Sequence, residues 1–145
     1  MQTREILRIV DANFNRSREG LRVCEEISRF VLQKRGLTQV LKKARHELSD
    51  CLITLPNPLS KIIEARDVKK DIGREPSSLE AKRKDWQSLF LANSQRVKES
   101  LRVLEETVKL IHPTGWKKIK NLRFKIYAVE KKAMPSLEAL RNHGR

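Results

Sequence analysis

"DANFNRSREGLRVCEE" (residues 11–26) returns 80 residues later as "LANSQRVKESLRVLEE" (residues 91–106). Both polar and apolar positions are shared between the two stretches. The identical pairs are Ala12/Ala92, Asn13/Asn93, Arg16/Arg96, Glu19/Glu99, Leu21/Leu101, Arg22/Arg102, Val23/Val103, Glu25/Glu105 and Glu26/Glu106. Because the chain repeats a pattern of helical period, we expect two similar helical units.

The repeat continues into a second segment of each half. "LKKARHEL" (residues 41–48) aligns with "IKNLRFKI" (residues 119–126), which places Arg45 opposite Arg123. Gly and Pro, five of each, are few and lie mostly between the periodic segments. The sequence therefore predicts an all-α protein. Its fold should be an antiparallel helical bundle built from two duplicated long/short helix hairpins with pseudo-two-fold symmetry.

A length of 145 residues suits a single helical domain, residues 1–145. The first hairpin should span residues 3–55. Its long helix should cover about residues 3–34, with Thr3 as the N-cap and Gly36 as the left-handed residue after the helix. Its short helix should cover roughly residues 37–55.

A connector should occupy residues 56–76, and the second hairpin residues 77–132. Ser77 and Glu80 form a capping-box pattern, which predicts that the second long helix begins there and runs to Ile111. Its partner should cover about residues 116–132. Because Pro135 cannot continue a helix without loss, we expect a separate short C-terminal helix at residues 136–143.

The net charge of +14 comes from 32 basic and 18 acidic residues. Such a chain attracts anions, including nucleic acid, nucleotide phosphates and membrane surfaces, although a charged solvated surface is an equal alternative. Cys24 and Cys51 lack metal-ligand spacing and fit reduced core positions. No apolar run approaches the ~20 residues of a membrane span, and no signal peptide is evident, so we expect a cytoplasmic protein.

Two polar residues interrupt the apolar face of each long helix. On a helical wheel, Asn13 lies at the centre of that face and Arg16 lies inside it, and Asn93 and Arg96 repeat the arrangement. A buried Asn needs hydrogen-bond partners and a buried Arg needs an anion. One interpretation is a polar zipper, in which Asn13 bonds Asn93 and the arginines pair with glutamates of the other hairpin.

The other interpretation is a polar cleft between the hairpins, with arginines directed at phosphate. Glu19 lies at the edge of the apolar stripe and could reach such a cleft, and so could Arg45 and Arg123 on the short helices. Arg22 and Glu25, with their copies in the second half, point away from the apolar centre. They fit ordinary surface ion pairs.

The connector segment "ARDVKKDIG" (residues 65–73) is the least helical stretch and carries Arg66, Asp67 and Asp71. Two carboxylates in a loop could hold Mg²⁺ or accept a proton, and they could equally be the caps of a turn. The sequence contains no Walker-type phosphate loop, no GxGxxG, no HExxH and no GxSxG.

Five segments in this order resemble one known family. They are "IVDANFNRSREGLRVCEEISRF", "LKKARHEL", "ARDVKKDIG", "LANSQRVKESLRVLEE" and "LRFKIYAVEK", and they cover about residues 5–132. They are similar to the small all-helical hydroxymethylpyrimidine-phosphate kinase domain found alone or fused ahead of thiamine-phosphate synthase. Cys24 departs from the leucine expected there, and Ser100 and Thr107 depart in the second copy. All three lie on helix faces.

The resemblance implies an enzyme, a phosphotransferase that moves the γ-phosphoryl group of ATP to a phosphorylated pyrimidine, with Mg²⁺ as cofactor. It also implies a functional link to thiamine-phosphate synthase, and an oligomer is compatible with it. Residue chemistry then suggests roles. The phosphates would be neutralised by Arg16, Arg96, Arg45 and Arg123, and the transferred group would be clamped by Arg66. Asn13 and Asn93 would orient groups of the substrate. Mg²⁺ would be held by Asp67 and Asp71, with help from Glu19 or Glu99.

The competing hypothesis is a basic helical protein that binds nucleic acid or acts as an adaptor, without catalysis. Its affinity would fall steeply with salt, because phosphate contacts release counterions. The polar pairs inside the apolar stripes favour the enzyme, since binding a nucleic-acid backbone needs only surface charge.

Overall fold

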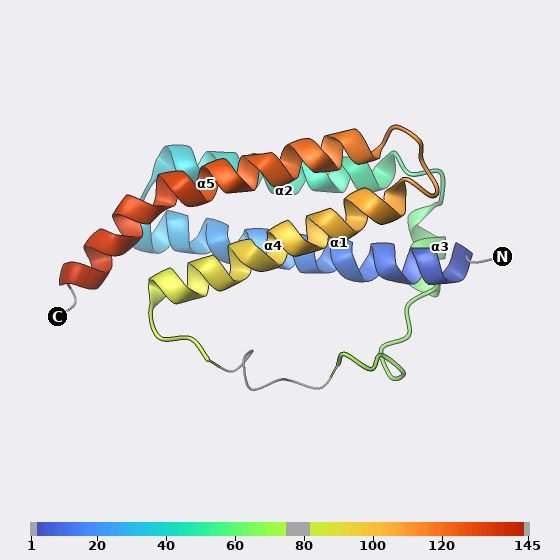
Figure 1. The fold of residues 1–145 in the computed structure, drawn as a ribbon, viewed down its shortest axis with the longest axis horizontal. Helices are drawn as coiled ribbons and strands as arrows, with labels where there is room; N and C mark the ends of the chain where they lie inside the picture. The colour runs from blue at the N-terminus through green and yellow to red at the C-terminus, as the bar shows by residue number, and fades with distance from the viewer. Residues whose placement is uncertain (1–2, 75–81, 144–145) are drawn as a thin grey trace.

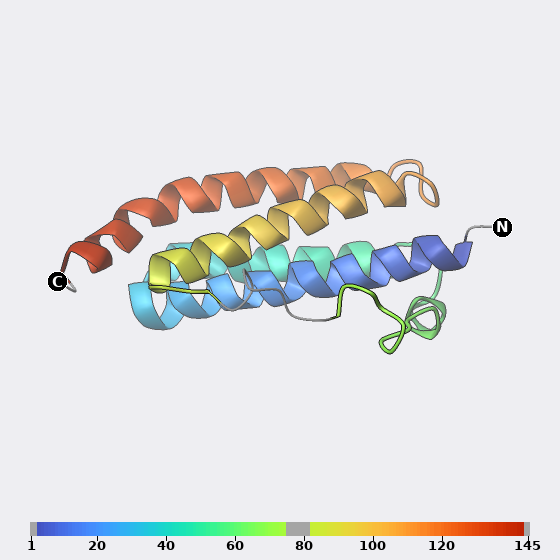
Figure 2. The same cartoon turned by 60° about the horizontal axis from the view of Figure 1, so that its bottom comes forward.

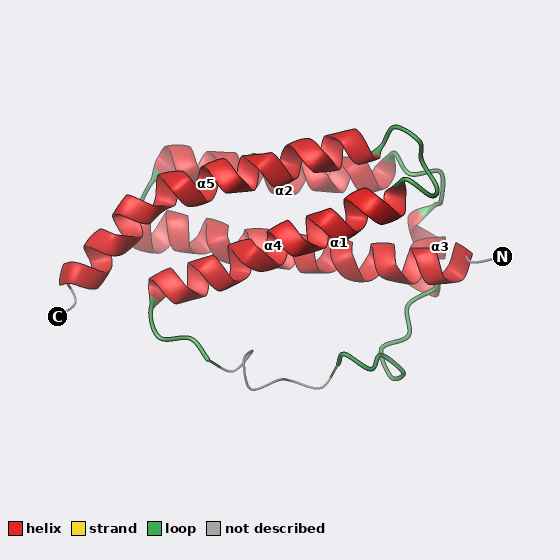
Figure 3. Cartoon of the chain, in the orientation of Figure 1, coloured by secondary structure: helices red, strands yellow, loops and turns green. Residues whose placement is uncertain are grey.

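The computed structural model describes residues 3–74 and 82–143, and these are helical apart from the connections (Figure 3). Its elements are α1 (Thr3–Glu26), η1 (Ile27–Leu32), α2 (Arg35–Ile53), α3 (Leu59–Glu64), α4 (Trp86–Val108) and α5 (Trp116–His143). No strand occurs in these ranges, so the predicted all-α class is confirmed. None of the described helices is apolar over a long enough stretch to cross a membrane.

The four long helices form two layers. In Figures 1 and 2, α1 and α2 lie in one layer and α4 and α5 in the other. Helix α1 contacts both α2 and α4, and α5 contacts both α4 and α2. The short helix α3 contacts α1 near its N-terminal end.

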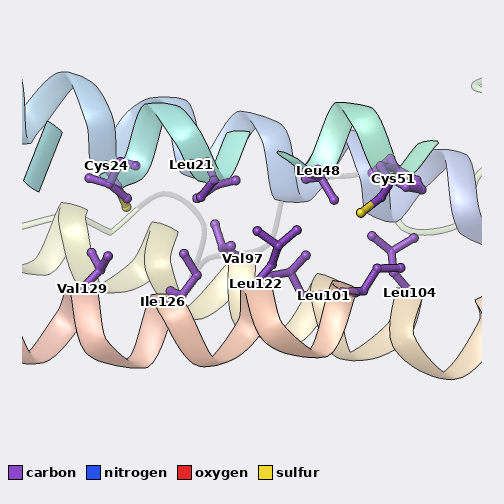
Figure 4. Packing of buried hydrophobic residues seen from close by; sticks show 14 of the residues in the cluster. Leu21, Cys24, Leu48, Cys51, Val97, Leu101, Leu104, Leu122, Ile126 and Val129 are labelled. Atoms are coloured by element: carbon purple, nitrogen blue, oxygen red, sulfur yellow. The ribbon is translucent and has the colours of Figure 1, made fainter. Parts of the chain in front are cut away.

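The hydrophobic core lies between the two layers. Leu21 and Cys24 of α1 and Leu48 of α2 face Val97 of α4 and Ile126 of α5 (Figure 4). These side chains are buried and recur at helical spacing, which is why each helix presents one apolar stripe. Burial of this stripe, at about 25 cal/mol per Å² of apolar surface, is the main force holding the layers together.

The crossing of α1 and α4 shows contacts that a two-fold repeat requires. The hydroxyls of Ser17 and Ser100 are 2.6 Å apart. At the repeat offset of 80 residues, Ser17 is equivalent to Val97 and Ser100 is equivalent to Gly20. Two-fold symmetry therefore requires a second contact, between Val97 and Gly20, and these residues are in contact. In the short helices, where the offset is 78 residues, Glu47 and Lys125 occupy equivalent positions. The ammonium of Lys125 lies 2.8 Å from the carboxylate of Glu47, so these two equivalent positions contact each other. Superposition of whole hairpins stays a prediction.

The close approach at Gly20 yields a stability prediction. A Cβ there would lie 2.7 Å from Val97 Cγ2 and 3.0 Å from the backbone oxygen of Asn93. Gly20→Ala should therefore destabilise the fold by about 1–2 kcal/mol, because overpacking outweighs the gain in helix propensity. Gly36→Ala is the control, because nothing lies within 4 Å of that position. Urea unfolding that finds Gly20→Ala as stable as wild type would contradict this packing.

The end of the first long helix differs from the prediction. Helix α1 continues as a π-helix to Leu32, and the left-handed residue is Gln33 (φ 53°) rather than Gly36. Gly36 lies in the first turn of α2, which begins at Arg35 and ends at Ile53 instead of spanning 37–55. The backbone N–H of Gln33 donates to the Ser28 carbonyl five residues back, which is the hydrogen bond of a π-turn. This wider turn ends the helix at Leu32, before the predicted end at residue 34.

The boundaries of the second hairpin also differ. Ser77 and Glu80 lie outside the described residues, and residues 82–85 are not helical, so α4 begins at Trp86. Asp85 and Ser88 form the capping box that starts it.

The predicted break before residues 136–143 is wrong. Helix α5 is continuous through Pro135, and Figure 1 shows it bending toward its C-terminal end. Ala133 and Leu137 are both buried, so core packing on either side of the proline holds the helix together.

Both cysteines are free and buried, as predicted. Burial raises the pKa of Cys24 to about 12, with a smaller contribution from Glu130, and burial also raises the pKa of Cys51. Since the thiolate is the reactive form, Cys24 should react with a disulfide reagent at pH 8 roughly a thousandfold more slowly than a free thiol. A thiol titration of native and unfolded protein measures this, and rapid native modification would contradict it.

Candidate functional site

Polar residues of α1 and of the connector surround one hollow with a cavity volume of about 510 Å³. We call it the connector hollow. It contains five residues that the sequence singled out, which are Asn13, Arg16, Arg66, Asp67 and Asp71. It is also lined by the arginines Arg8 and Arg74 and by the carboxylates Glu5 and Asp11. The sequence pattern by itself does not mark these four residues.

Arg66 is held in place by a buried carboxylate. Its Nε and Nη2 donate to Asp11 Oδ2 and Oδ1 at 2.7 and 2.6 Å. This hydrogen bonding raises the pKa of Arg66, and the Asp11 side chain is only 9% exposed. Helix α3 carries the chain back toward α1 and places Arg66 beside it. The position equivalent to Asp11 in the second half is Leu91, so this pair is particular to the first half.

Asp67 and Asp71 shape the loop that closes the connector hollow. Asp67 Oδ1 accepts the backbone N–H of Lys70, and Asp71 Oδ1 accepts that of Gly73. Each carboxylate thus caps a turn through one oxygen, and both line the hollow. Among the described residues, no group of three or more His, Cys, Asp or Glu could hold a metal ion by itself.

A second hollow, of about 440 Å³, lies between α1 and α4, and we call it the interhelix hollow. Asn13 and Arg16 line both hollows, so the two adjoin. Arg96 and Glu99 from α4 line the second one. The predicted concavity shared by Arg16 and Arg96 is therefore present. The expectation that these arginines lie within the apolar face is wrong, because both are exposed. Their long side chains carry the guanidinium groups out to solvent.

The two asparagines bond within their own helices. Asn13 Nδ2 donates to the Ile9 carbonyl and Asn93 Nδ2 to the Leu89 carbonyl, both at 2.8 Å. Asn13 is 4% exposed, as predicted, while Asn93 is only half-buried. The described residues show no bond between the two, so the zipper is not formed in this arrangement. Asn13 Oδ1 instead accepts from Arg16 Nη1 at 3.4 Å.

Two glutamates expected on the surface are buried. Glu25 and Glu105 have side chains only 4% and 3% exposed. Arg45 donates through Nε and Nη2 to the carboxylate of Glu25, at 3.3 and 3.4 Å. Arg123 makes the same two bonds to Glu105, at 2.9 and 3.4 Å. A helical wheel could not show this, because the second helix of each hairpin covers the glutamate.

Four sequence candidates lie outside the two joined hollows. Arg45 and Arg123 are engaged with the buried glutamates. Glu19 lines an apolar hollow beside Trp86, and Asn93 does not line either joined hollow. The structure thus brings together Asn13, Arg16, Arg66, Asp67, Asp71, Arg96 and Glu99.

Comparison with known proteins gives a consistent result. A model described as the ThiD2 family matches residues 8–132. A thiamine-phosphate synthase from Synechocystis is 43% identical over 126 residues, which is 86% of this chain and 35% of that protein. The thiamine-phosphate synthase from Nostoc punctiforme is 38% identical over 89% of this chain and 35% of that protein. The thiamine-phosphate synthase from Rhodopirellula baltica is 36% identical over 88% of this chain and 34% of that protein.

The chain therefore spans about a third of the length of these curated relatives. No solved structure matches it.

Proposed function

Because the chain belongs to the ThiD2 family, we propose that it is a hydroxymethylpyrimidine-phosphate kinase that acts in thiamine biosynthesis. The reaction would break the bond between the β,γ-bridging oxygen and the γ-phosphorus of ATP. A phosphate oxygen of the pyrimidine monophosphate would take the phosphoryl group, giving the diphosphate and ADP. The names of the curated relatives support the pathway, and the ordered motifs support the reaction.

One observation carries this proposal: the two joined hollows share Asn13 and Arg16, and their lining includes the predicted residues Arg66, Arg96, Asp67 and Asp71. Phosphoryl transfer needs positioning and charge neutralisation more than a covalent catalyst. Arg16 lines both hollows and is the best placed to contact the transferred group. Arg66, whose orientation is fixed by Asp11, and Arg96, on the opposite helix, would neutralise donor and acceptor phosphates.

The donor set fits Mg²⁺ that arrives with ATP. Mg²⁺ is usually held by one or two carboxylates together with substrate phosphates and water. Asp67 and Asp71 each use Oδ1 for a turn and would offer the other oxygen to the ion, with Glu99 as a further carboxylate in the adjoining hollow. When bound, the ion would neutralise charge on the ATP phosphates.

The acceptor explains why the described lining of the joined hollows includes no histidine or cysteine. A phosphate monoester is largely ionised near neutral pH, so no general base is needed to activate it. Asn13 could hydrogen-bond the substrate through its amide. Arg45 and Arg123 would serve the fold instead, because Glu25 and Glu105 already neutralise them.

A coupled assay for ADP release, with the pyrimidine monophosphate, ATP and Mg²⁺, tests the proposal. ADP should form only when the phosphorylated acceptor is present, and the unphosphorylated hydroxymethyl alcohol is the control acceptor. Product identity is checked by mass spectrometry. Absence of turnover with the monophosphate would end the kinase hypothesis.

A second candidate is nucleic-acid binding, which the net charge of +14 favours. In that case affinity for a generic RNA should fall steeply between 50 and 200 mM salt, as expected when phosphate contacts release counterions. The polar, carboxylate-containing lining of the connector hollow favours the kinase, because carboxylates repel a nucleic-acid backbone.

A further inference from the structure

A third hollow lies outside the proposed catalytic site, where α1 ends and α2 begins. We call it the basic hollow; its cavity volume is about 740 Å³. Six cations line it, which are Arg22, Arg29, Lys34, Arg35, Lys42 and Arg45. Figure 1 places this end of the bundle opposite α3 and the first turns of α1. Arg16 and Arg29 are about 20 Å apart along the helix, given a rise of 1.5 Å per residue.

The positive charge of the basic hollow is only partly compensated. Glu25 is the one carboxylate among the described residues that line it, and it already binds Arg22 and Arg45, at 2.9 and 3.3 Å. Within the described residues, Lys34, Arg35 and Lys42 form no ion pair. Because like charges gathered in a concave surface focus the electrostatic potential, this hollow attracts anions.

The backbone also shapes the basic hollow. The π-helix η1 contains Phe30, which is 61% exposed and whose ring centroid lies 4.7 Å from the guanidinium carbon of Arg29. Gln33 then adopts a left-handed conformation, and Lys34, the N-cap residue before α2, makes no side-chain capping bond. An exposed aromatic ring thus stands beside uncompensated cations, which is the pairing that binds a phosphorylated aromatic compound.

The second half of the chain carries larger side chains at the equivalent turn. The position equivalent to Thr38 is Trp116, whose indole lies 4.9 Å from the ammonium of Lys109. There His112 Nδ1 accepts the backbone N–H of Gly115 at 3.0 Å. An indole and an imidazole therefore occupy the turn before α5. In the first half, the smaller Thr38 lines an open hollow.

We propose that the basic hollow binds a phosphorylated aromatic small molecule of the nucleoside diphosphate class, separately from the proposed catalytic site. The uncompensated cations Lys34, Arg35 and Lys42 would hold the phosphates, and Phe30 would stack on the base. The volume lies within the range of about 300–1,000 Å³ typical of small-ligand sites. A concave site of this size favours a small molecule over a nucleic acid.

Residue-resolved NMR titration tests this proposal with two probes, ADP and inorganic pyrophosphate, without Mg²⁺. Amides of residues 33–42 should shift with both probes. Lys42→Glu should weaken binding of both about tenfold or more, because it replaces an attraction with a repulsion. Lys120→Glu is the matched control, at the equivalent exposed position of α5, and should leave these shifts unchanged. Phe30→Ala should weaken ADP about tenfold but not pyrophosphate.

Two outcomes would overturn the proposal. One is the absence of shifts in residues 33–42 at millimolar probe. The other is equal weakening by Lys42→Glu and Lys120→Glu, together with displacement of ADP by single-stranded RNA, which would indicate diffuse attraction of nucleic acid. Because the shifts are read at residues 33–42, the result does not depend on kinase activity.

Discussion

Arg16→Ala should lower kcat/KM for the proposed phosphoryl transfer by about a hundredfold to a thousandfold, while the Tm changes by less than about 2 °C. The large kinetic effect is expected because charge-neutralising donors act most strongly in the transition state. The small effect on stability follows from the surroundings, because Arg16 is exposed and its side chain makes one long bond within the described residues, to neutral Asn13. The measurements are steady-state kinetics and thermal unfolding of the same preparation.

Arg96→Ala should behave similarly, because Arg96 is exposed and lines the interhelix hollow from the opposite helix. Arg18→Ala is the matched control: it removes the same charge from the exposed side of α1, two residues from Arg16 and outside both joined hollows. If Arg18→Ala slows the reaction as much as Arg16→Ala, general electrostatics explains the loss. A large fall in Tm for Arg16→Ala with intact turnover would favour a structural role.

Arg123→Leu should cost about 3–5 kcal/mol of stability, which is roughly a 10 °C fall in Tm for a chain of this size. Hydrogen bonding to Glu105 raises the pKa of Arg123, and the two side chains are 11% and 3% exposed. Without Arg123, the one ion-pair partner that the described residues leave to the buried Glu105 is the exposed Arg102, at 3.6 Å. A buried carboxylate without a close partner is expensive, because the protein cannot replace its hydration.

The double variant Glu105→Leu/Arg123→Leu is the decisive comparison. It removes both charges and should recover most of the loss, because an apolar pair of similar volume has no desolvation penalty. Arg102→Leu is the control for charge alone and should cost less than about 1 kcal/mol. Arg45→Leu should cost less than Arg123→Leu, since Glu25 retains Arg22 at 2.9 Å. A Tm for Arg123→Leu within 2 °C of wild type would show that the pair contributes little.

The sequence determined the fold class and identified seven of the residues that line the connector hollow and the interhelix hollow. Repeated apolar positions with helical period, 80 residues apart, predict two matching helices, because period and register are local properties of the chain. Asn13, Arg16 and Arg96 were identified because they break or flank that pattern. Arg66, Asp67 and Asp71 were found because the connector lacks helical periodicity.

Tertiary structure alone decided which charges are buried and which are open. The sequence placed Glu25 on an exposed face, and only the covering α2 makes it the partner of Arg45. Asp11 was missed because its partner, Arg66, lies 55 residues away and reaches it only through the turn after α3. Helix α5 runs through Pro135 because packing at Ala133 and Leu137 outweighs the lost backbone bond. In each case the deciding energy comes from contacts between segments distant in the chain, which local periodicity does not contain.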